Sequence, residues 1–253
     1  MPKEEMLKGS INKESIIKTL DQHYFKDLDK KWKYHLQTMF SDIKDNDLIR
    51  VRYYDNRHAK PDIVISACNR SVNVTIKTGH APSIHNESIT TFITFLKNIN
   101  VPDNIISIIK FYHYGVSSSV HTNGTIYNRE EILDKYPHLI NEASNYFSTH
   151  KEKVKKIIYR SIIRGKTHSE PIDYFYYGNV YKGFLLSKYD ILDFITSDNN
   201  STCKSLHFCQ LVYQPCSRDI SKKGRHSMKI SWPILCLKFY DEKFNKRYGY
   251  IEE

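Results

Sequence analysis

Long apolar runs are missing from this chain of 253 residues. No stretch approaches the roughly 18 consecutive apolar residues that a membrane-spanning helix needs, so the sequence predicts no membrane span. The first residues also lack the apolar core that is typical of a secretory signal peptide. From these two absences we expect a cytoplasmic protein.

Paired cysteines at metal-binding spacing are missing as well. The chain has five cysteines, an odd number, and contains no C-x-x-C motif. Without an export signal, cysteines are most simply interpreted as reduced thiols. A structural zinc site among the C-terminal Cys and His residues therefore has little support.

Low-complexity linkers and internal repeats are also absent, whereas aromatic residues are plentiful, with 19 Tyr and 12 Phe. This composition indicates a packed globular protein rather than a disordered one. A chain of this length can bury a substantial core, as one domain of ordinary size or as two small ones.

Basic residues exceed acidic ones, giving a formal net charge of +10. The surplus is concentrated in separate stretches: residues 151–170 hold seven basic and two acidic residues, and residues 201–253 hold ten and five. Such stretches suit a polyanion-binding surface, because neutralising phosphates releases condensed counterions. A merely solubilising surface is the alternative, and charge alone does not decide between the two.

Two short runs rich in Ile and Val follow each other near the middle of the first half. Residues 61–66 begin with Pro-Asp and continue into an apolar run, a polar turn follows at 69–71, and residues 72–77 end in Lys77. Residues 48–54 alternate in the manner of a strand, and we predict that the two runs that follow form adjacent strands. Helical spacing of apolar residues predicts a helix over 12–40 and another over 84–98.

The ends of these two runs carry chemistry. Alternation places Thr75 and Lys77 on one strand face, close to Asp62 at the start of the adjacent strand. A carboxylate can hold Mg²⁺, which polarises a phosphodiester and lowers the pKa of the attacking water. A lysine can orient that water or stabilise the developing negative charge. Taken singly, Pro-Asp is also a common strand start, and a terminal lysine is commonly just solvated.

Pro61-Asp62 and Thr75-Ile76-Lys77 resemble the motif of the PD-(D/E)XK nuclease superfamily, which includes many type II restriction endonucleases. The resemblance covers about residues 12–110. It implies an α/β restriction-endonuclease-like core with a mixed central sheet flanked by helices, over residues 1–165 with the N-terminal helix. Residues 166–253 would form an α+β region that contacts DNA, although the chain could also be a single domain.

The same resemblance implies Mg²⁺-dependent, site-specific cleavage of double-stranded DNA. Possible partners are a second copy of the chain and a DNA methyltransferase that acts on the same site. The alternatives are a DNA-binding protein on a degenerate nuclease fold that has lost catalysis, and a structural or partner-binding protein with a solvating basic surface.

The chain departs from the motif at Thr75, where an acidic residue is expected. Some enzymes of the superfamily take the second carboxylate from the following helix, and Glu87 is the only acidic residue between Lys77 and Asp103. We therefore predict Asp62 and Glu87 as metal ligands, with Asp62, Lys77 and Glu87 as the catalytic residues. The alternative is that Glu87 is only a carboxylate stabilised by a helix N-terminus. Glu14 of the first helix is a further candidate.

Base readout needs hydrogen-bonding side chains in addition to phosphate contacts. Strands are expected over 206–213 and 228–239, with a basic loop between them. The candidate DNA-binding residues on this hairpin and its loop are Gln214, Arg218, Lys222, Lys223, Arg225 and Lys229. The basic stretch 151–166 is expected to follow phosphates, since lysine is a flexible point charge.

Overall fold

The computed structural model describes residues 2–56, 59–79, 82–116, 125–165, 170–197, 204–216 and 226–250. The chain forms two compact units, each assembled from separate segments. Unit 1 contains Met1–Pro82, Ile162–Ile191 and Ile234–Glu253, and unit 2 contains Ser83–Ser161 and Leu192–Pro233. The division expected at residue 165 stays a prediction; the chain passes from unit 2 back to unit 1 nearby, between Ser161 and Ile162.

Unit 1 is built around a mixed sheet with the strand order β1-β2-β3-β4-β6-β7. Its strands are β1 (His23–Tyr24), β2 (Leu48–Tyr53), β3 (Ile63–Ala67), β4 (Arg70–Lys77), β6 (Tyr174–Gly178) and β7 (Gly183–Ser187). Strands β4 and β6 run parallel, and every other neighbouring pair is antiparallel. The helices of unit 1 are α1 (Pro2–Leu20), the short 3₁₀ helix η1 (Phe25–Asp27), α2 (Lys30–Met39), α9 (Ile234–Phe239) and α10 (Glu242–Tyr248). The prediction of an α/β protein with a mixed sheet is confirmed.

The single helix predicted over 12–40 is wrong, because the chain forms two helices there. Helix α1 ends at Leu20, and Gln22 then adopts a left-handed backbone with φ of 60°. Helix α2 restarts behind Asp29, whose carboxylate accepts a hydrogen bond from the Trp32 N–H. The apolar periodicity continues through both helices, so the sequence pattern does not reveal the break between them.

A two-residue turn sets the register of β3 against β4. Cys68 and Asn69 have φ of 52° and 56°, as a type I′ hairpin turn requires, so the turn lies earlier than the predicted 69–71. Ile63 then pairs with Val74, and the Asp62 N–H donates to the Val74 carbonyl at 2.9 Å.

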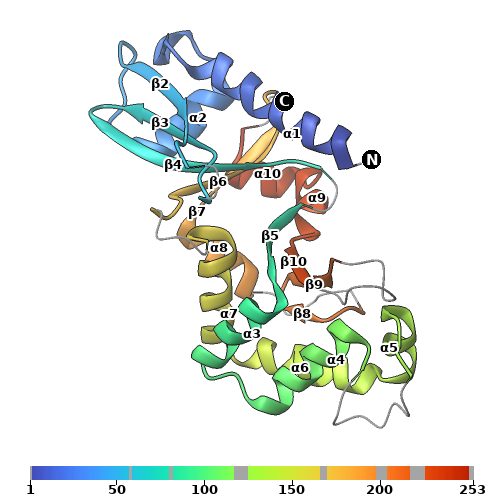
Figure 1. The fold of residues 1–253 in the computed structure, drawn as a ribbon. Helices are drawn as coiled ribbons and strands as arrows, with labels where there is room; N and C mark the ends of the chain where they lie inside the picture. The colour runs from blue at the N-terminus through green and yellow to red at the C-terminus, as the bar shows by residue number, and fades with distance from the viewer. Residues whose placement is uncertain are drawn as a thin grey trace. The chain divides into compact units, whose positions relative to one another are not determined.

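The two faces of this sheet bury different apolar groups. Helices α1 and α2 pack on the face that carries Ile65, Ile76 and Tyr176, and Figure 1 shows both in blue beside β2–β4. At β6 and β7, the ring of Tyr177 meets that of Phe239 from α9 at 5.8 Å, and Phe184 meets Phe244 from α10 at 4.9 Å. Helices on both faces thereby enclose the sheet at this end.

Unit 2 combines a helical layer with an antiparallel sheet of order β5-β10-β9-β8. Its strands are β5 (Ser83–Ser88), β8 (His207–Phe208), β9 (Leu211–Pro215) and β10 (Ser227–Ser231). Its helices are α3 (Ile89–Asn98), α4 (Asp103–Tyr114), α5 (Arg129–Lys135), α6 (Pro137–Thr149) and α7 (Lys151–Ile158). A π-helical turn at Tyr159–Ile163 and helix α8 (Lys188–Ser197) carry the chain between the units.

Aromatic side chains fill the core of unit 2. Phe208 lies 4.6 Å from Phe147 and 5.9 Å from Phe92 between ring centroids, and Tyr213 stacks on Phe92 at 6.0 Å. Such offset and edge contacts add stabilisation beyond the buried area. The core therefore joins helices α3 and α6 to the sheet.

Three sequence predictions for unit 2 and its neighbourhood are wrong. The single strand expected over 206–213 is divided into β8 and β9, which pair with each other on either side of Cys209. The helix expected from residue 84 begins at Ile89, and residues 83–88 form strand β5 instead. The strand expected over 228–239 ends at Ser231, and Ile234–Phe239 is helix α9 of unit 1. None of the helices in the described part of the chain is long and apolar enough to cross a membrane.

Candidate active site

Asp62 is held at the start of β3 by contacts to both of its carboxylate oxygens. Oδ2 accepts hydrogen bonds from the Thr75 hydroxyl at 2.8 Å and from the Ile76 N–H at 2.7 Å. Oδ1 lies 2.5 Å from the Nζ atom of Lys13 on helix α1. The carboxylate is thus fixed by two separate elements, and only a sixth of its side chain remains exposed.

Positive charge keeps this carboxyl group ionised. Burial by itself would raise the pKa of Asp62, but the charges of Lys77 and Lys13 and the hydrogen bonds from Lys13 and Ile76 outweigh it. The pKa of Asp62 consequently lies below its usual value. The centre combines one anionic group with two cationic ones.

Lys77 ends strand β4 on the same face as Thr75, as the alternation of side chains predicts. Its side chain is half-buried, and its charge is the larger of the two that lower the pKa of Asp62. The structure therefore brings Asp62, Thr75 and Lys77 together.

Comparison with known proteins adds nothing to this site. No protein family model matches the sequence, and no curated protein matches it. Any functional reading of the site therefore depends on its own geometry and chemistry.

Lys13 is the residue of this site that the sequence analysis missed. It lies three, four and seven positions before Ile16, Ile17 and Leu20, so it extends the apolar stripe of α1 by one turn. Glu14, the acidic candidate from this helix, points elsewhere: it pairs with Lys18 at 2.8 Å and remains largely exposed. A lysine on the buried stripe of α1 is the sequence feature from which Lys13 could have been predicted.

Glu87, the predicted second carboxylate, belongs to unit 2, whereas Asp62 belongs to unit 1. It lies on strand β5 rather than at a helix start, and Ser88 caps helix α3 in its place. Arg160 donates two hydrogen bonds to the carboxylate, from Nε to Oε1 at 3.0 Å and from Nη2 to Oε2 at 2.7 Å. The Nε2 atom of His85 lies 2.8 Å from Oε1.

These partners hold Glu87 ionised inside unit 2. Its side chain is 0% exposed, and burial alone would raise its pKa. The hydrogen bonds and charges of His85 and Arg160 reverse that effect and lower the pKa to about 2. To serve as a metal ligand, this carboxylate would have to give up a buried bidentate ion pair, which is costly.

The donor set around Asp62 limits the metal it could hold. Among the described residues, no three His, Cys, Asp or Glu side chains gather into a metal-binding group. Magnesium keeps several waters and needs only one or two protein carboxylates together with substrate phosphate. Asp62 therefore fits Mg²⁺ as a single-carboxylate ligand, provided that Lys13 leaves Oδ1.

The candidate DNA-binding residues fall partly within the described chain. Arg218, Lys222, Lys223 and Arg225 lie outside the described residues. Gln214 on β9 and Lys229 on β10 are directly opposite each other, and Lys229 is also opposite Asn86 on β5. The three polar residues form one row across the partly exposed face of the sheet, whereas Met228 and Glu87 face the buried side.

Basic side chains also line one side of helix α7. Lys151, Lys155 and Lys156 are exposed, while Val154 and Ile157 are buried on the opposite side. This division leaves the ammonium groups available to a polyanion.

Proposed function

We propose that this protein is a Mg²⁺-dependent endonuclease that cleaves double-stranded DNA at the centre formed by Asp62, Thr75 and Lys77. The convergence of these three residues carries the proposal. The order of elements in unit 1 supports it: helix α1, three antiparallel strands β2–β4, and then β6 parallel to β4. The PD-(D/E)XK nucleases, which the sequence resembles, have a core of this type.

Each residue has a role in the proposed reaction. Mg²⁺, when bound, supplies Lewis-acid stabilisation of the phosphate and a more acidic water. Asp62 holds the ion, and the Thr75 hydroxyl and the Ile76 N–H keep its carboxylate in place. Lys77 places a positive charge where negative charge develops on the phosphate oxygens.

Recognition of DNA is assigned to unit 2. The exposed lysines of α7 would contact phosphates, and the row Asn86, Lys229 and Gln214 offers the side-chain types that read base edges in the major groove. Selective readout would make the protein a restriction enzyme. A palindromic target would then call for a homodimer, and a DNA methyltransferase would protect the same site.

The second candidate is a DNA-binding protein without catalysis. Two observations favour it: Lys13 occupies Oδ1 of Asp62, and Thr75 stands where the motif has its second carboxylate. In this case Asp62 and Lys13 would serve only as a structural ion pair.

A cleavage assay separates the two candidates. We expect the wild-type protein to cut mixed-sequence DNA only with Mg²⁺, and Lys77→Ala to lose that activity while it still binds DNA. Lys18→Ala, on the exposed side of α1, is the control and should cut normally. Binding that weakens steeply with salt but no cutting by the wild type would favour the second candidate.

A further inference from the structure

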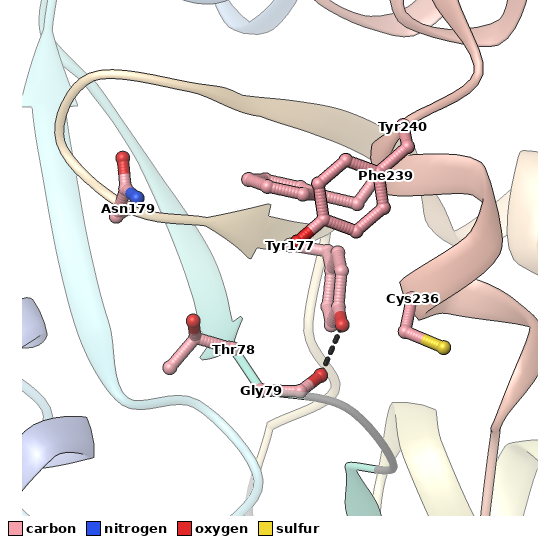
Figure 2. A pocket seen from close by; sticks show the side chains of 7 residues that line it. All are labelled: Thr78, Gly79, Tyr177, Asn179, Cys236, Phe239 and Tyr240. Atoms are coloured by element: carbon pink, nitrogen blue, oxygen red, sulfur yellow. Dashed lines mark hydrogen bonds between the residues drawn. The ribbon is translucent and has the colours of Figure 1, made fainter.

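A small cavity opens within unit 1 where β4 and β6 end (Figure 2). Its volume is about 210 Å³, below the roughly 300–1,000 Å³ of pockets for drug-sized ligands. A cavity of this size suits one flat ring system rather than a whole nucleotide. Its lining includes Thr78, Gly79, Tyr177, Asn179, Phe239 and Tyr240.

Tyr177 forms a fixed wall of the cavity. Its hydroxyl donates a hydrogen bond to the Gly79 carbonyl, drawn as the dashed line in Figure 2. Its ring and that of Phe239 form a T-shaped pair. Burial raises the pKa of the phenol, so it stays neutral and keeps donating. The wall is therefore formed before any ligand binds.

Tyr240 lines the cavity, and the Lys182 ammonium lies over two of the rings that line it. Tyr240 is 66% exposed although it lines the cavity. The Nζ atom of Lys182 lies 5.4 Å from the Phe239 ring centroid and 5.8 Å from that of Tyr240. Exposed aromatic rings beside a cation suit the binding of a single nucleotide: the ring stacks on the base, and the cation attracts the phosphate.

The strand register ties this cavity to the candidate active site. Lys77 pairs with Tyr177 across the parallel strands β4 and β6, and Thr78, the next residue, lines the cavity. A base bound in this cavity would belong to a nucleotide close, along the DNA strand, to the phosphate that contacts Lys77.

We propose that this cavity binds one unstacked nucleobase of the DNA strand that is cut, with Tyr240 as the stacking residue. The proposal rests on the proposed nuclease function. It adds a specific requirement, namely that a base leaves the duplex stack near the scissile phosphate, which costs a few kcal/mol and is offset by stacking on the protein.

The test measures binding in the Asp62→Asn background, so that no probe is cut. The probes are a short oligothymidylate and an abasic oligonucleotide of equal length. We expect tighter binding of the oligothymidylate, and a loss of that preference by about 5- to 150-fold in Tyr240→Ala, equivalent to ~1–3 kcal/mol per stacked base. Tyr240→Trp should keep the preference.

Tyr189→Ala is the matched control. Tyr189 is 69% exposed and lies under the Lys188 ammonium at 5.6 Å, but it does not line the cavity. Equal preference in Tyr240→Ala, Tyr189→Ala and the parent would overturn the proposal. The nuclease function fails separately, if the wild type does not cut DNA; a base preference that depends on Tyr240 would then remain as binding alone.

Discussion

The ammonium of Lys13 lies 2.5 Å from the carboxylate of Asp62, joining helix α1 to the start of β3 across 49 positions of sequence. This ion pair has two consequences. It lowers the pKa of the carboxyl group, and it occupies the oxygen that a metal ion would need. In the proposed nuclease, Lys13 would therefore compete with Mg²⁺ for Asp62.

Removing Lys13 should tighten metal binding. In Lys13→Met we expect the Mg²⁺ concentration for half-maximal cleavage to fall a few-fold, because an ion pair that is partly exposed contributes up to about 1 kcal/mol. Lys18→Met, on the same helix, is the control. An unchanged or higher Mg²⁺ requirement in Lys13→Met would contradict competition.

Glu87 should make stability sensitive to acid. Its folded-state pKa is about 2, below the ~4.3 of an unfolded chain, so its contribution is fully present above pH ~4.5 and is lost as the pH falls toward 2. Urea unfolding of the wild type and Glu87→Gln at pH 7 and at pH 3 measures this. We expect the wild type to lose more of its free energy of unfolding than the variant, and equal losses would contradict the assignment.

Arg160 should be needed because Glu87 is buried. Arg160→Met leaves that carboxylate without its bidentate partner and should lower the free energy of unfolding by about 3 kcal/mol, at the low end of the usual range because Arg160 is 19% exposed. The double variant Glu87→Gln, Arg160→Met should recover much of the loss. A double variant as unstable as the sum of both single variants would rule out the coupling.

Replacing each of two glycines with alanine should change stability in opposite directions. Gly115 ends α4 with φ of 78°, and an added Cβ would lie 2.1 Å from the Tyr127 carbonyl oxygen, so Gly115→Ala should destabilise unit 2. Gly9 lies inside α1 with open space around it, so Gly9→Ala should stabilise by about 0.5–1 kcal/mol. Thermal unfolding measures both, and shifts of the same sign would argue against the backbone assignment.

Variants that lose a base contact and variants that lose a phosphate contact should differ in the pattern of DNA fragments they produce. Gln214→Ala, in the polar row of unit 2, should cause cutting of plasmid DNA at additional sites, since a bidentate base contact contributes about 1–3 kcal/mol of discrimination. Lys155→Ala, on α7, should weaken binding to all sequences and leave the fragment pattern unchanged. Identical fragment patterns in both variants would remove Gln214 from recognition.

Local alternation was enough to predict the strand arrangement around Asp62, Thr75 and Lys77, because a hairpin with a short turn fixes its own register. Lys13 was within reach of the same reasoning, since it extends the buried stripe of α1. Glu87 was not. Strand β5 forms by pairing Glu87 with Met228, which lies far away in the sequence, and a charged residue on the buried face disguises the alternation.

The interleaving of the two units also had no local signal. The segment between β4 and β6 contains most of unit 2. The chain enters unit 2 at Ser83 and leaves it after Ser161, and neither point carries a Gly- or Ser-rich linker. The strand predicted over 228–239 also failed for lack of a local signal. Ile234–Phe239 is apolar enough for either a helix or a strand, and its packing against β6 favours the helix.

The rate of single-turnover DNA cleavage by Asp62→Asn tests the central claim most directly. Asparagine keeps the size of the side chain and can still accept the Thr75 and Ile76 hydrogen bonds, but it removes the charge that would hold Mg²⁺. We predict a fall of about 100-fold or more relative to the wild type, comparable with the loss of a group that stabilises developing charge, and no change in the control Glu14→Gln. A folded Asp62→Asn protein that cuts DNA within a few-fold of the wild-type rate would contradict the account.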